Sequence, residues 1–181
     1  MIFVKNADYL GQPHDLAVKH GKIAALAPAG QLPAEFAPKE GDQEKITDGK
    51  GLVLFPSLID AHVHLREPGF EWKEDVASGL KAAAHGGMAR VMCMPNTDPV
   101  NDDSSVTTLI LEAARKAWPD GPFVHPVAAA TMGLEGKGLA PLGELAAAGC
   151  VAVSNDGKPI QDTEILRRVM EYASDLNLTL I

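Results

Sequence analysis

Leu58-Ile59-Asp60-Ala61-His62-Val63-His64-Leu65-Arg66 ends an apolar run with polar residues at alternate positions. Side chains alternate across a β-strand, so Asp60, His62, His64 and, if the strand continues, Arg66 are expected to share one face. Neutral imidazole is a good zinc ligand, and a strand presents two histidines at this spacing side by side. The stretch therefore predicts a strand that ends in a metal site. The alternative is a pair of histidines hydrogen-bonded within a polar core.

Outward from this stretch, short apolar segments alternate with longer amphipathic ones, which is typical of a parallel α/β domain. Strands are expected over 53–64, 89–94, 122–128, 151–154 and 178–181, and helices over 74–85, 103–118 and 162–176. The pattern fits either a doubly wound sheet or a (β/α)₈ barrel, and its period does not choose between them. A barrel needs roughly 250 residues, so only its first four to five βα units would fit here.

The first 50 residues have a different rhythm, with short apolar runs separated by turn residues. Small strands are expected around 2–4, 16–18 and 22–26, followed by a loop over 28–48 that is rich in Pro, Ala, Glu and Lys. A domain boundary is expected near residue 52. The chain then divides into residues 1–51 and residues 52–181.

Composition excludes several classes of function. The formal net charge is −8 with no cluster of Lys and Arg, which argues against a nucleic-acid surface. No apolar run approaches the length of a membrane span, and the first residues lack a secretory pattern, so a cytoplasmic protein is expected. Cys93 and Cys150 lie in apolar stretches without CxxC spacing and are interpreted as buried thiols. A small anionic substrate would have to be held by local cations and metal.

Three further motifs make the pattern specific. The histidine pair continues as His64-Leu65-Arg66-Glu67-Pro68-Gly69-Phe70, and two turns follow later strands: Met94-Pro95-Asn96-Thr97-Asp98-Pro99 and Ser154-Asn155-Asp156-Gly157. Together these motifs resemble dihydroorotase of the bacterial type, within the amidohydrolase superfamily. The resemblance implies a (β/α)₈ barrel with a small β-domain built from both chain ends. Residues 1–51 would then begin a small β-sandwich, and residues 52–181 would form the first half of a truncated barrel.

The resemblance also implies roles for five residues. His62 and His64 would be zinc ligands, Asp156 a carboxylate ligand able to bridge a second zinc, and Arg66 and Asn96 would hold the substrate carboxylate. The chemistry agrees, because a guanidinium forks onto a carboxylate and an amide adds a neutral donor.

Each of these residues has a simpler interpretation. Arg66 could form a surface ion pair with Glu67 or Glu71, Asn96 could be a turn residue, and Asp156 could stabilise a tight turn with Gly157. The family often has two adjacent aspartates where this chain has Asn155-Asp156. Asp156 is matched on the glycine that follows it.

The activity implied is reversible cyclisation of N-carbamoyl-L-aspartate to L-dihydroorotate in pyrimidine biosynthesis. The family also requires two further histidines and an aspartate general base on later strands, expected beyond Ile181. We therefore expect this chain alone to be inactive, and its open strand edges to pair with the remainder of the enzyme or with another copy. Two alternatives stay open: another cyclic amidohydrolase such as allantoinase or hydantoinase, or a silent dihydroorotase-like subunit that supports aspartate transcarbamoylase.

Overall fold

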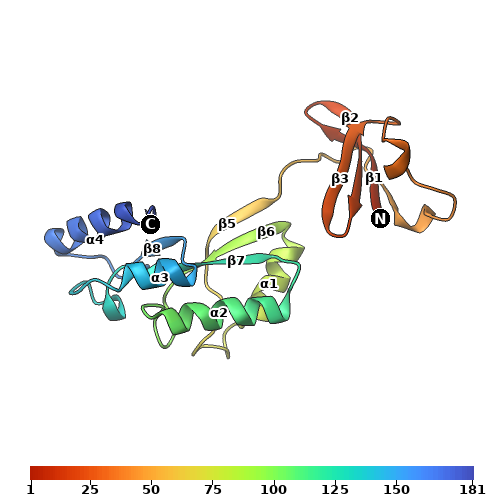
Figure 1. The fold of residues 1–181 in the computed structure, drawn as a ribbon. Coiled ribbons are helices and arrows are strands. Elements are labelled where there is room, and N and C mark those ends of the chain that lie inside the picture. The colour runs from red at the N-terminus through yellow and green to blue at the C-terminus, as the bar shows by residue number, and fades with distance from the viewer. The chain divides into compact units, whose positions relative to one another are not determined.

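The computed structural model describes residues 1–181, the side chain of Glu44 excepted. The chain divides into two compact units, Met1–Pro56 and Ser57–Ile181, each drawn in Figure 1. The positions of the two units relative to one another are not determined, so each is described by itself. None of the helices described is long and apolar enough to cross a membrane.

The first unit is a four-stranded sheet in the order β3-β2-β1-β4. Its strands are β1 (Ile2–Tyr9), β2 (Gln12–Lys19), β3 (Lys22–Pro28) and β4 (Ile46–Asp48). β1, β2 and β3 are antiparallel neighbours, and β4 runs parallel to β1. The segment expected as a loop contains two short 3₁₀ helices, η1 (Ala34–Phe36) and η2 (Gln43–Lys45), and then β4.

The second unit contains a five-stranded parallel sheet whose strands follow their order in the chain, β5-β6-β7-β8-β9. These strands are β5 (Leu58–Val63), β6 (Met88–Cys93), β7 (Phe123–Ala129), β8 (Ala152–Ser154) and β9 (Thr179–Leu180). In a doubly wound sheet the strand order would reverse partway across, whereas a (β/α)₈ barrel adds each strand beside the last. The strand order therefore decides the question that the sequence period leaves open, in favour of the first strands of a barrel.

Helices connect these strands: α1 (Val76–His85), α2 (Ser104–Ala117), α3 (Leu142–Ala148) and α4 (Thr163–Asp175), with a 3₁₀ turn η3 (Met132–Leu134) before α3. α1 packs on β6, and α2 packs on β7 and beside α1 and α3, an arrangement that Figure 1 shows. Three of the helices begin at an aspartate whose side chain accepts from the backbone N–H groups of the first turn: Asp75, Asp103 and Asp162. Such caps satisfy donors that have no partner within the helix.

Two apolar clusters fill the space between sheet and helices. One includes Leu80 of α1, Val91 of β6 and Ile110 of α2, and the other includes Leu145 of α3 and Val169 of α4. All five side chains are almost fully buried. The predicted fold class, a partial parallel α/β barrel after a separate β unit, is thereby confirmed.

The expected alternation along the first barrel strand is wrong in one respect. The pairing of β5 with β6 shifts register between Asp60 and Val63. Asp60 pairs with Val91, which is buried in the core under the helices, and Asp60 also lines a cavity with Gly79 and Ala82 of α1. Because paired residues in a parallel sheet point to the same face, Asp60 lies on the helix side, and its carboxylate accepts from the His62 backbone N–H at 3.1 Å. An irregularity of this kind re-aims the side chains that follow it.

Candidate metal centre

The candidate site is built from residues at the carboxyl ends of three parallel strands, β5, β6 and β8. His62 lies within β5 and His64 directly after it, Asn96 follows β6, and Asp156 follows β8. The carboxyl ends of parallel strands meet at one edge of the sheet, which is where barrel enzymes place their sites. The fold therefore brings together residues that are 32 and 60 positions apart in the chain, in the pairs His64–Asn96 and Asn96–Asp156.

Three of these side chains form a group with the chemistry of a metal site. One ligand atom each from His62, His64 and Asp156 lie within 4.8 Å of one another. The imidazole rings of the two histidines are 5.3 Å apart and steeply inclined. His62 Nε2 lies 3.3 Å from Asp156 Oδ1, and two ligands of one tetrahedral zinc would be roughly 3.4 Å apart. Two imidazoles and a carboxylate this close together could hold a metal ion.

Asn96 connects two members of this group. Its Nδ2 donates to Asp156 Oδ2 at 2.5 Å, and its Oδ1 lies 2.9 Å from His64 Nδ1. A carboxylate without a proton can only accept, so the NH₂ end of the amide has to face Asp156. The carbonyl end then faces His64, and Nδ1 has to carry the proton. His64 is left with a free lone pair on Nε2, the form in which a histidine binds a metal.

Asp156 lies in a turn after β8 and has a left-handed backbone conformation. Its φ angle is 42°, in the left-handed region that non-glycine residues rarely adopt. Its backbone N–H donates to Ser154 Oγ at 2.9 Å. The side chain is largely buried, at 11% relative exposure, whereas that of His62 is 54% exposed. The carboxylate is thus the more enclosed member of the group.

Arg66 lies in the loop that follows the histidines and not on the strand, because β5 ends at Val63. Its φ angle is 64°, and within the described part of the chain its side chain makes no hydrogen bond or ion pair, so neither Glu67 nor Glu71 holds it. This loop is tied to the Asn96 turn: Asp98 N donates to Pro68 O at 3.0 Å, and a Cβ at Gly69 would overlap the Asp98 backbone. Arg66 and Asn96 therefore belong to two loops packed together at the same edge.

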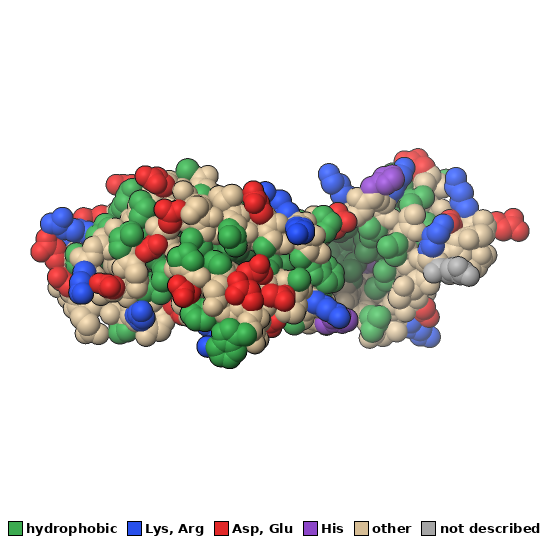
Figure 2. All heavy atoms as spheres, turned by 90° about the horizontal axis from the view of Figure 1, so that it is seen from below, with side chains coloured by type: hydrophobic (Ala, Val, Ile, Leu, Met, Phe, Trp, Pro, Cys, Tyr) green, Lys and Arg blue, Asp and Glu red, His purple; other side chains and the backbone are tan. Residues whose placement is uncertain are grey.

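A cavity of about 740 Å³ opens beside the metal group. It is lined by His62 and Leu180 and by the segment after β8, Ser154 to Ile160. The net charge is −8, so the protein as a whole does not attract anions, and an anionic ligand would have to be held by groups at the site itself. Figure 2 shows acidic side chains in red and basic ones in blue on one face of the molecule.

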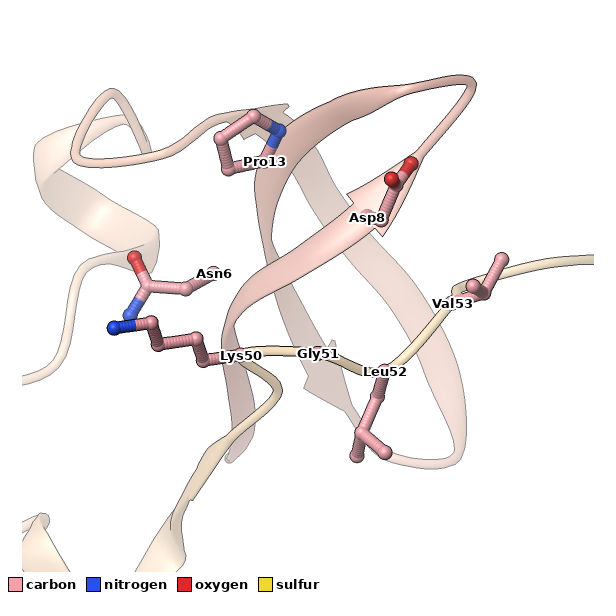
Figure 3. A pocket seen from close by; sticks show the side chains of 7 residues that line it. All are labelled: Asn6, Asp8, Pro13, Lys50, Gly51, Leu52 and Val53. Atoms are coloured by element: carbon pink, nitrogen blue, oxygen red, sulfur yellow. The ribbon is translucent and has the colours of Figure 1, made fainter.

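The first unit has a cavity of its own, about 570 Å³, lined by Asn6, Asp8, Pro13 and residues 50–53. Figure 3 shows Asn6 and Lys50 together on one side and the Asp8 side chain pointing away from them. The Asp8 carboxylate accepts from Gly11 N at 2.7 Å, within its own turn. These polar groups do not converge, so this cavity lacks the donor set of a metal or catalytic site.

Asn155 and Ser154 were not assigned roles from the sequence, and neither was the link from Asn96 to the metal group. The Ser154 hydroxyl accepts a hydrogen bond from the Asp156 backbone N–H. The Asn155 side chain accepts a hydrogen bond from Thr131, in the loop after β7. Their only sequence signal is their position beside a candidate ligand. The contact of Asn96 with His64 and Asp156 depends on the packing of separate strands and has no local signal.

Comparison with protein families gives a match to the model described as Dihydro-orotase-like, over residues 51–181. The chain is 52% identical over 180 residues to a dihydroorotase of Syntrophotalea carbinolica, covering 99% of this chain and 41% of that protein. It is 46% identical over 168 residues to a dihydroorotase of Syntrophus aciditrophicus, covering 92% of this chain and 37% of that protein. The chain thus spans about two fifths of the length of these curated relatives.

Solved structures with a similar fold include an L-hydantoinase (dihydropyrimidinase) from Arthrobacter aurescens. It has a TM-score of 0.72 at 17% identity, over 99% of this chain and 39% of that one. A D-hydantoinase from a Thermus species gives a TM-score of 0.62 at 18% identity, with the same coverage of both chains. At these identities the likeness concerns the fold alone.

Proposed function

This chain belongs to the dihydroorotase-like family, and from that premise we propose that it supplies metal-binding and substrate-binding residues of a dihydroorotase. The reaction would be the reversible cyclisation of N-carbamoyl-L-aspartate to L-dihydroorotate, a step of pyrimidine biosynthesis. The observation that carries the proposal is the group formed by His62, His64 and Asp156, whose ligand atoms lie within 4.8 Å of one another. It occurs in a chain that is 52% identical to a dihydroorotase.

The metal is proposed to be zinc, held by His62, His64 and Asp156. Bound zinc supplies a Lewis acid that polarises a carbonyl oxygen and lowers the pKa of water. Asp156 Oδ1 faces His62, and Oδ2 accepts from Asn96. Each carboxylate oxygen has two lone pairs, so this carboxylate could hold one zinc or bridge two.

Arg66 and Asn96 are proposed to bind the carboxylate of the substrate. A guanidinium matches a carboxylate with two parallel hydrogen bonds, and the Arg66 side chain is not engaged elsewhere in the described structure. Asn96 has two hydrogens on Nδ2, and only one is used by Asp156. The second N–H of Asn96 can therefore donate to the substrate carboxylate while the first still donates to Asp156.

We place the protein in the cytoplasm, where its two buried cysteines would stay reduced. Its partner is proposed to be the remainder of the enzyme or another copy, because β5 and β9 are the terminal strands of the described sheet and unpaired edges favour strand addition. Aspartate transcarbamoylase is a further candidate partner.

A chimera gives the sharpest test of the activity. Residues 1–181 would replace the matching part of the Syntrophotalea carbinolica relative, and hydrolysis of dihydroorotate would be followed by the loss of its absorbance. We expect an active chimera, no activity after His62→Ala, and no activity from the 181-residue chain alone. A folded, zinc-loaded chimera that does not hydrolyse dihydroorotate would contradict the proposal. Hydrolysis by the 181-residue chain alone would contradict the expected dependence on further strands.

The same chimera separates the rival functions. A hydantoinase would open a hydantoin ring in preference to dihydroorotate. A silent subunit would raise the activity or stability of aspartate transcarbamoylase without binding zinc. Because the two histidines and the carboxylate are all present and adjacent, we expect zinc in the purified protein by metal analysis and expect neither rival pattern.

A further inference from the structure

Asn155 is a buried amide that connects two loops at the edge of the sheet where the metal group lies. It is 7% exposed. Its Oδ1 accepts from the Thr131 backbone N–H at 3.2 Å and from Thr131 Oγ1 at 2.9 Å, and its Nδ2 donates to Lys158 O at 3.1 Å. Thr131 is itself fully buried and accepts from Gly136 N. The amide therefore fastens the turn after β8 to the loop after β7.

The residue inside that turn is the candidate metal ligand Asp156. Its φ angle of 42° lies in the left-handed region. Two neighbours hold the turn in this conformation: Ser154 Oγ accepts from the Asp156 N–H, and Asn155 closes the turn onto Lys158 O. An amide suits the second task because it accepts from Thr131 and donates to Lys158 with one side chain.

We propose that Asn155 is a positioning residue for the metal centre: its amide fixes the turn that presents the Asp156 carboxylate, and so sets the zinc affinity. The inference rests on the metal centre proposed above. It assigns Asn155 no contact with metal or substrate. Residues that hydrogen-bond a metal ligand without touching the metal typically lower the metal affinity 10- to 100-fold when they are removed.

A purely structural role is the competing explanation, and the chain offers a matched control for it. Asn101 is also a fully buried asparagine, with Nδ2 donating to Val127 O and Oδ1 accepting from Thr107 Oγ1. It holds the loop after β6 but makes no hydrogen bond to the metal group. If Asn155 mattered only for stability, Asn155→Ala and Asn101→Ala would affect zinc binding alike.

The experiment is calorimetric titration of the 181-residue chain with Zn²⁺, with circular dichroism melts of each variant. Asn155→Ala is expected to weaken zinc binding about 10- to 100-fold, and Asn101→Ala to lower the melting temperature without changing the zinc Kd. Thr131→Val removes only the hydroxyl bonds, keeps the fold, and should weaken zinc binding about fivefold. If Asn155→Ala does not fold, the zinc Kd of Thr131→Val tests the positioning role instead.

The possible outcomes separate the two proposals. If the zinc Kd of Asn155→Ala is unchanged and His62→Ala still abolishes zinc binding, the positioning role is overturned. If Asn155→Ala does not fold, an unchanged zinc Kd in Thr131→Val overturns it in the same way. An equal loss in Asn101→Ala also overturns it, because the effect would then be general loosening. A wild-type chain whose zinc binding does not depend on His62 overturns the metal centre itself, and the positioning role with it.

Discussion

Replacing Asn96 by leucine would remove the amide that links two candidate ligands while keeping a side chain of similar size. In the structure this amide accepts from His64 Nδ1 and donates to Asp156 Oδ2. Leucine can do neither, so His64 loses its fixed tautomer and Asp156 loses a donor. We expect zinc binding to weaken in the 181-residue chain, before any substrate is present.

The magnitude follows from the two hydrogen bonds. A bond between neutral groups is worth about 0.5–1.5 kcal/mol and one to a charged group about 1.5–3 kcal/mol. Both bonds of Asn96 are part-buried, so water can replace some of each, and the lower ends of these ranges apply. Their sum is about 2 kcal/mol, or about thirtyfold in Kd. This lies within the range usual for groups that orient metal ligands.

Zinc affinity would be measured by calorimetry, with Thr97→Val as the control from the same turn. Thr97 Oγ1 donates to Pro99 O at 2.8 Å and touches neither ligand, so its loss should lower the melting temperature and leave the zinc Kd alone. A Kd for Asn96→Leu equal to that of the wild type would refute the reasoning. Asn96 would then act on substrate only.

Four further outcomes are expected. Leu80→Ala should lower the free energy of unfolding in urea by about 2–5 kcal/mol, because the Leu80 side chain of α1 is fully buried; a negligible loss would contradict that packing. Hydrogen bonds from backbone donors lower the pKa of the Asp75 carboxyl below 3.8. The ionised Asp75 cap therefore stabilises α1 above pH 3.8, and this stabilisation is lost as the pH falls through the lower pKa of the folded state. In thermal melts, Asp75→Ala should be less stable than wild type at pH 7 and equal to it in strong acid. Burial raises the pKa of Cys93 to about 12, so a thiol reagent at pH 8 should meet roughly one thiolate in ten thousand and react only after unfolding. In sedimentation the chain should self-associate, since Ile59 of β5 and Ile181, directly after β9, are 59% and 49% exposed; a monodisperse monomer would argue against open edges.

Local patterns predicted the bounds of α1, α2 and α4 well, gave none for α3 (Leu142–Ala148), and predicted the strand boundaries less well. The helix expected over 103–118 is observed at Ser104–Ala117, because its apolar stripe and its Asp103 cap are both encoded within the segment. The strand expected over 53–64 begins only at Leu58. The apolar residues before it belong to the first unit, where Asp8 N donates to Leu52 O and Asp8 bridges Val53. Apolar composition predicts burial but does not say against which sheet.

The candidate site was predictable as a set of residues because each follows a strand of a parallel sheet, and such strands end at one edge. Their arrangement was not predictable. The register shift that turns Asp60 toward α1 depends on pairing with β6. The left-handed φ angle at Arg66 occurs in a loop whose Gly69 packs against the Asp98 backbone. Neither leaves a trace in the alternation of residue types along the strand.

The two asparagines at this edge explain why chemistry at the site depends on more than its ligands. Asn96 carries donor and acceptor between His64 and Asp156, and Asn155 does the same between Thr131 and Lys158. An aspartate at position 96 could only accept, and would set its carboxylate against that of Asp156. At position 155, where the resembling family often has an aspartate, the amide of this chain adds a hydrogen bond to Lys158 O that a carboxylate could not donate. The turn that carries Asp156 is therefore held in this chain by a side chain that both donates and accepts.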